Sequence, residues 1–80
     1  MRQYIATFHT HVSALLTSQA LKKAGVKARM APVPRKLSSS CGTCVFYEAE
    51  QPHLEMMDRD VEAVYETGAG DSATRLYENQ

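Results

Sequence analysis

The stretch QYIATFHTHVSALLTSQALKKAG, residues 3–25, predicts a strand that leads directly into a helix. Side chains alternate between two faces over residues 3–9, as expected of a strand. Thr10 then supplies a helix N-cap, and helix-forming residues follow over 11–24 before Gly25 favours a stop. This part of the chain therefore predicts one β-α unit.

The predicted helix has a small and apolar side and a polar side. On a helical wheel the first side contains Ala14, Leu16, Thr17, Ala20, Leu21 and Ala24. The second side contains Ser18, Gln19, Lys22 and Lys23. Leu15 is the exception, and we expect it on the outside of the helix.

Three further strand patterns follow the helix. Residues 26–31 alternate as a half-buried strand, and Pro32 and Pro34 end it because neither residue can donate to a sheet ladder. The second pattern is CVFYEAE, residues 44–50, and the last is ATRLYE, residues 73–78.

A second helix is predicted between the last two strands. Pro52 is a suitable first helical residue. The apolar residues that then follow helical spacing are Leu54, Met57, Val61, Val64 and Tyr65. Asp58 is an alternative cap for a shorter helix.

The resulting order, β-α-β-β-α-β, predicts an α+β fold of the ferredoxin-like type. In that fold a four-stranded antiparallel sheet carries both helices on one face. Right-handed crossovers would place the first and third strands in the middle of the sheet. We expect residues 1–80 to form a single small domain. Its uncovered sheet face leaves a homodimer open as an alternative.

Composition and charge narrow the classes of function. The chain is 44% hydrophobic, and nine basic residues balance nine acidic ones. A nucleic-acid-binding protein usually has a basic excess, so this class is not expected. No apolar run approaches the about 20 residues of a membrane span, and the first residues lack the apolar core of a secretory signal. We therefore expect a cytoplasmic protein with no membrane partner and no cofactor.

The two cysteines, Cys41 and Cys44, lie three residues apart in the loop after the prolines. In a reducing compartment this spacing favours redox chemistry or metal binding over a structural disulfide. The neighbouring residues that favour a thiolate or a persulfide anion are the basic Arg35 and Lys36, the hydroxyl donors Ser38 and Ser40, and the flexible Gly42. We expect Cys41 to be the exposed nucleophile and Cys44 to be partly buried.

Three other interpretations of the cysteine pair stay open. The pair could be a thiol–disulfide redox module, in which both sulfurs are needed. It could bind a metal ion if His9, His11 or a second chain completed the ligand set, because zinc usually takes four ligands. In the third interpretation the cysteines are incidental to a regulatory or protein-interaction domain.

Several short motifs within residues 4–49 point to a known family. They are Thr7-Phe8-His9, Lys23-Ala24-Gly25, Pro32-Val33-Pro34-Arg35 and Ser40-Cys41-Gly42. With these motifs the segment resembles the selenium/sulfur carrier-like family, which is largely described as a domain of unknown function. The same segment is similar to the C-terminal part of a selenium-metabolism protein. The resemblance implies that Cys41 is the carrier thiol and that Cys44 is auxiliary.

The sequence therefore predicts a sulfur or selenium carrier. Cys41 would accept a persulfide, or its selenium equivalent, from a donor such as a cysteine desulfurase and pass it to an acceptor protein. Cys44 would act as a resolving or auxiliary thiol. Such a protein transfers an atom stoichiometrically and is not expected to be an enzyme on its own. Seven of the nine basic residues lie within the first 36 residues and could steer docking on an acidic partner.

Overall fold

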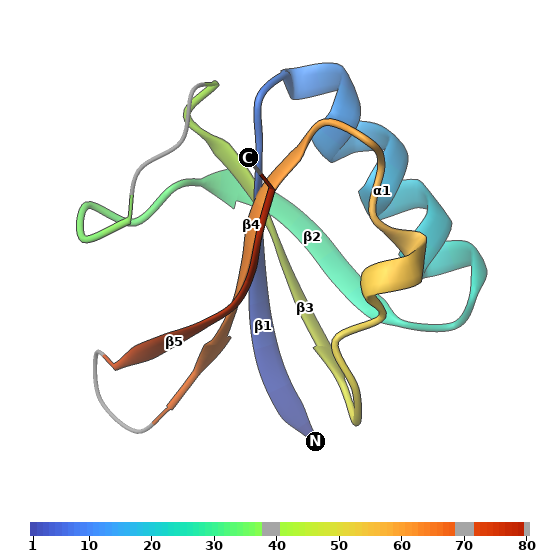
Figure 1. Cartoon of the computed structure of the whole chain (residues 1–80). Helices are drawn as coiled ribbons and strands as arrows, with labels where there is room; N and C mark the ends of the chain where they lie inside the picture. The colour runs from blue at the N-terminus through green and yellow to red at the C-terminus, as the bar shows by residue number, and fades with distance from the viewer. Residues whose placement is uncertain (38–40, 69–71, 80) are drawn as a thin grey trace.

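The computed structural model describes residues 1–37, 41–68 and 72–79, which form a five-stranded antiparallel sheet with one α-helix across one face (Figure 1). The strands are β1 (Arg2–Phe8), β2 (Lys27–Pro32), β3 (Thr43–Ala49), β4 (Val61–Thr67) and β5 (Ala73–Glu78). The helical elements are α1 (His11–Lys23) and the single 3-10 turn η1 (Leu54–Met56). The strand order in the sheet is β2-β3-β1-β4-β5.

The β1-α1 unit forms as the sequence predicts. The Thr10 side chain caps α1 by accepting a hydrogen bond from the backbone N–H of Ser13 at 3.1 Å. The helix ends before Gly25, whose φ of +87° is the left-handed conformation that favours glycine at this place. The Gly25 N–H then donates to the Lys22 carbonyl at 3.0 Å and closes the last turn.

The predicted α+β class is confirmed, and two details of the predicted fold are wrong. The sheet has five strands where the sequence predicts four, because β5 adds to the free edge of β4. The described residues contain one α-helix where the sequence predicts two. The first four strands do follow the order β2-β3-β1-β4, so the first and third strands lie inside the sheet as predicted.

The segment predicted as the second helix forms η1 and β4 instead. In β4 the register shifts opposite Thr7 and Phe8, so that Ala63 pairs with Thr7 and Val61 pairs with Phe8. Glu62 is therefore the extra residue of a β-bulge. The bulge brings Val61 and Val64, three residues apart, to the buried side of one strand. In the sequence, a spacing of three between apolar residues is also the spacing expected on one face of a helix.

The core lies between α1 and the sheet. Its largest members come from β1 and β3, where the rings of Tyr4 and Tyr47 stack with centroids 5.2 Å apart. Buried residues of this cluster are Tyr4, Ala6, Phe8, Ala14, Leu21, Val45, Tyr47, Ala49, Val61 and Val64. Alternate residues of β1 face the other side of the sheet, where Ile5 and Thr7 are also buried.

The buried side of α1 agrees with the predicted one in part: Ala14, Thr17 and Leu21 are buried as predicted. The sequence predicts Leu16 inside, yet Leu16 is 48% exposed, and Ser18, predicted outside, is buried. Leu15 is exposed as predicted. The buried residues of α1 are Ser13, Ala14, Thr17, Ser18 and Leu21.

Asp58 bonds to two of the buried hydroxyl groups of α1. Its carboxylate accepts a hydrogen bond from the Ser13 hydroxyl at 2.7 Å, and its backbone N–H donates to the Thr17 hydroxyl oxygen at 3.0 Å. These bonds satisfy two buried hydroxyl groups and attach the segment between η1 and β4 to α1. Asp58 thus caps no helix of its own.

None of the helical segments in the described part of the chain has the length and the apolar character needed to cross a membrane.

Candidate functional site

The two cysteines lie in and beside the hairpin connection between β2 and β3. Pro32 and Thr43 are the last paired residues of the two strands, and the Val33 N–H donates to the Gly42 carbonyl at 3.1 Å beyond them. Gly42 has a φ of +74°, a conformation that glycine adopts without steric cost. Cys41 therefore comes directly before the turn residue Gly42, and the next residue, Thr43, is already paired in the sheet.

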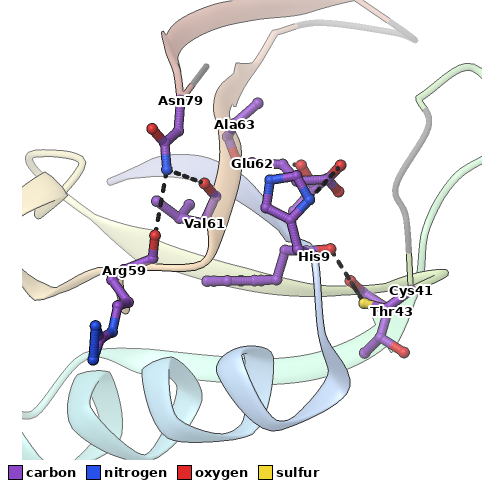
Figure 2. Close-up of polar contacts among 10 residues, drawn as sticks. His9, Cys41, Thr43, Arg59, Val61, Glu62, Ala63 and Asn79 are labelled. Atoms are coloured by element: carbon purple, nitrogen blue, oxygen red, sulfur yellow. Dashed lines mark hydrogen bonds and ion pairs between the residues drawn. The ribbon is translucent and has the colours of Figure 1, made fainter.

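Cys41 is partly exposed and lies at the end of β1. Its Sγ is 3.3 Å from the carbonyl oxygen of Phe8 and 3.5 Å from that of Thr43. Figure 2 shows Cys41 and Thr43 beside the turn that leads from β1 into α1. The thiol is thus held against a rigid strand end and still has an accessible side.

Cys44 has the opposite environment. It is 0% exposed, and its Sγ lies 3.7 Å from the Pro32 carbonyl oxygen. Burial raises the pKa of the Cys44 thiol to about 11; the charge of Arg29 opposes this shift, and Cys41 adds to it. At neutral pH Cys44 is consequently a protonated, solvent-excluded thiol.

The two sulfurs contact different strands. Cys41 reaches the carbonyl of Phe8 in β1, and Cys44 reaches the carbonyl of Pro32 in β2, on the other side of β3. Both cysteines are free thiols in this structure. The two thiols thus differ in their access to solvent, since Cys41 is partly exposed and Cys44 is buried.

The predicted anion-binding residues lie partly outside the described chain. Arg35 and Lys36 are exposed in the turn after β2, where the Leu37 N–H donates to the Pro34 carbonyl at 3.0 Å. Lys36 also lines a shallow hollow on the sheet face opposite α1. Ser38 and Ser40 lie outside the described residues. The roles of these side chains remain predictions.

His11 and His9 have partners that the sequence did not indicate. His11 Nδ1 lies 3.4 Å from the Thr43 hydroxyl, which joins the start of α1 to the start of β3. His9 Nδ1 lies 3.4 Å from a carboxylate oxygen of Glu62, the bulged residue of β4 (Figure 2).

Asn79 supports the backbone on either side of this bulge. Its side-chain amide donates to the Arg59 carbonyl at 3.3 Å and to the Val61 carbonyl at 3.1 Å (Figure 2). Its backbone N–H donates to the Glu62 carbonyl at 2.8 Å. Because a bulge leaves backbone groups without ladder partners, these bonds stabilise it. No periodicity in the sequence predicts such a contact.

The proposed metal ligands do not form a metal site in the described chain. Among residues 1–37, 41–68 and 72–79, no group of three or more His, Cys, Asp or Glu side chains is arranged to hold an ion. Cys41 and Cys44 contact different strands, and His9 pairs with Glu62.

Comparison with known proteins gives the family of the chain. It is 35% identical over 46 residues to the uncharacterized protein YtiA of Escherichia coli (strain K12), a match that covers 58% of this chain and 54% of that protein. The chain thus spans about half the length of this curated relative. No solved structure matches the chain significantly. Residues 3–64 match the model of the family described as "Putative Se/S carrier protein-like", and the chain belongs to that family.

Proposed function

We propose that this protein carries sulfur or selenium on Cys41, as a persulfide or its selenium equivalent. The observation that carries the proposal is the contrast between the two thiols. Cys41 is partly exposed beside the end of β1, whereas Cys44 is fully buried and has a pKa of about 11. Membership of the family is consistent with a carrier.

The transfer step is a thiol–persulfide exchange. The Cys41 thiolate attacks the terminal sulfur of a persulfide on the donor protein, and a new bond forms between this sulfur and Cys41 Sγ. The sulfur–sulfur bond of the donor breaks, and the donor cysteine leaves as a thiolate. The same exchange, with Cys41 Sγ as the leaving group, delivers the cargo to a thiolate of the acceptor. No net oxidation or reduction occurs.

Residues of the hairpin would stabilise the charged states of Cys41. Gly42 allows the backbone amides of the turn to face an anion, and Arg35 and Lys36 supply positive charge in the same loop. We include Ser38 and Ser40 in this group as hydroxyl donors.

The redox alternative receives less support from the same geometry. A Cys41–Cys44 disulfide would require reaction of the Cys44 thiol, which is 0% exposed and whose pKa is raised to about 11. A module that cycles through a disulfide would be expected to keep both thiols accessible and easily ionised.

Intact mass spectrometry of the loaded protein tests the proposal. The protein and its Cys41→Ser and Cys44→Ala variants are incubated with a cysteine desulfurase and cysteine, without reductant. We expect an added mass of one sulfur atom in the wild type and in Cys44→Ala, and none in Cys41→Ser. A wild-type mass lower by two hydrogens, with no sulfur adduct in any variant, would favour the redox module.

A further inference from the structure

The outer face of α1 exposes apolar side chains while its inner face buries hydroxyl groups. Val12 is 61% exposed, Leu15 40% and Leu16 48%. These residues have the i, i+3 and i+4 spacing of one helical face, and we call them the α1 stripe. The buried face of α1 includes the polar residues Ser13 and Thr17, while the α1 stripe is exposed. Packing of the core therefore does not explain the apolar character of the stripe.

The α1 stripe begins next to the carrier thiol. His11, the residue before Val12, lies 3.4 Å from the hydroxyl of Thr43. The carbonyl oxygen of Thr43 lies 3.5 Å from Cys41 Sγ. Figure 1 shows the start of α1 at the same end of the sheet as the start of β3. A protein that covers the stripe would therefore also approach Cys41.

The charge of α1 indicates the kind of partner that fits this surface. The helix HVSALLTSQALKK contains no acidic residue, and Lys22 and Lys23 lie in its last turn. The complementary surface has apolar side chains at its centre and carboxylates toward the end of the stripe that faces these lysines.

The size of the stripe favours a transient complex over a homodimer. A stable interface uses about 20 or more residues on each side, whereas the stripe has three apolar side chains on one short helix. A small, weakly binding surface suits a carrier, because the carrier must leave its donor after each transfer.

We propose that the α1 stripe is the docking surface for the protein that donates sulfur to Cys41, and that this donor presents an apolar patch bordered by carboxylates. This inference rests on the proposed carrier function.

The test compares a protein donor with a small-molecule donor. Loading of Cys41 is followed by intact mass with a cysteine desulfurase plus cysteine, and separately with glutathione persulfide, which needs no docking surface. The variant is Leu16→Glu. The matched control is Leu76→Glu on β5, because Leu76 is 40% exposed and β5 is the edge strand beyond β4.

We expect Leu16→Glu to lower the loading rate from the desulfurase about tenfold or more, as for an interface residue with a central role. Its loading from glutathione persulfide should equal that of the wild type, and Leu76→Glu should match the wild type with both donors. Lys22→Glu should also slow the desulfurase reaction, with a larger effect at low salt.

Four outcomes would overturn the docking proposal. The first is equal loading rates for Leu16→Glu and Leu76→Glu. The second is loss of loading from both donors in Leu16→Glu, which would mean that the substitution acts on Cys41 itself. The third is a wild-type protein that glutathione persulfide loads and the desulfurase does not. The fourth is a wild-type dimer in sedimentation analysis that Leu16→Glu converts to a monomer.

Failure of the carrier function itself would look different. In that case neither donor would add sulfur to the wild-type protein, and the docking proposal would fall with it.

Discussion

The stability of the protein depends on pH through Cys44, because folding raises the proton affinity of its thiol. The ordinary pKa of 9.0 rises to about 11 in the folded protein, chiefly through burial. Between these pH values the folded state keeps a proton that the unfolded state loses. The contribution to stability is therefore complete below about pH 9 and is lost as the pH rises toward 11.

We predict that Cys44→Ala removes this dependence. From pH 9 to pH 11 the wild type should lose on the order of 2 kcal/mol more of its free energy of unfolding than the variant, because only the wild type has this titrating thiol. Urea unfolding of both proteins at several pH values measures this difference. Burial also raises the pKa of Tyr47, but both proteins contain Tyr47, so its contribution cancels when the two profiles are subtracted. Parallel pH profiles for the two proteins would contradict the prediction.

Gly42 matters for the site through its backbone conformation. Its φ of +74° strains any side chain, although a Cβ at this position would meet no atom within 4 Å. We predict that Gly42→Ala costs about 1–2 kcal/mol in urea unfolding. Gly42→Asn should cost less, because Asn tolerates this conformation better. Equal stability of Gly42→Ala and the wild type would show that the loop adopts another backbone there.

At the scale of elements, the parts with regular periodicity were predictable. The strand β1, the cap at Thr10 and the stop at Gly25 depend on local residue types, and the structure contains all three. The prediction of a helix through Val61 and Val64 was wrong because of the bulge at Glu62. In a regular strand, residues on one face are two positions apart, and the bulge makes Val61 and Val64 three positions apart on the same face. The bulge itself depends on partners such as Asn79, which lie far away in the sequence.

The orientation of α1 was predictable only in part for a similar reason. Periodicity correctly places Thr17 inside, but it does not indicate that Ser13 is buried with its hydroxyl bonded to Asp58. Asp58 lies 45 residues from Ser13, so a local pattern carries no sign of this contact.

We predict that Asp58→Ala loosens the connection between η1 and β4. It leaves the Ser13 hydroxyl, which belongs to a residue only 1% exposed, without its acceptor. The expected loss is about 1–3 kcal/mol in the free energy of unfolding, because a buried polar group loses its partner. Glu50→Ala, at an exposed acidic residue, is the control and should change stability little. A similar loss in both variants would rule out the contact as a specific stabiliser.

At the scale of the whole molecule, β1 is the centre of the structure. It pairs with β3 on one side and with β4 on the other, and it also contributes Tyr4, Ala6 and Phe8 to the core. The edge strands are β2 and β5, and β5 is exposed along most of its length. The first four strands have the sheet order that the sequence predicts, but β4 takes the place predicted for the C-terminal strand.

Amide hydrogen exchange should follow this arrangement. We predict the slowest exchange in β1 and β3 and clearly faster exchange in β5, because edge strands open without disrupting the core. Measurement by NMR at neutral pH gives the order of protection. Protection of β5 equal to that of β1 would mean that another surface covers the edge, in this chain or in a second copy.

The difference between the two thiols was predictable from position alone, since Cys41 lies in a turn and Cys44 opens a strand. Which carbonyl each sulfur contacts, and that these carbonyls belong to different strands, follows only from the folded sheet. The burial of Cys44, in contrast to the partly exposed Cys41, is the reason for proposing Cys41 as the carrier thiol.

The most direct test of the carrier function is to locate the added sulfur in the wild-type protein. After reaction with a desulfurase and cysteine, persulfides and thiols are capped with an alkylating reagent, and the peptide that contains both cysteines is fragmented in a mass spectrometer. We predict that the extra sulfur atom is found on Cys41, with Cys44 present as an ordinary thiol. An extra sulfur on Cys44, or a Cys41–Cys44 disulfide as the main product, would contradict the account.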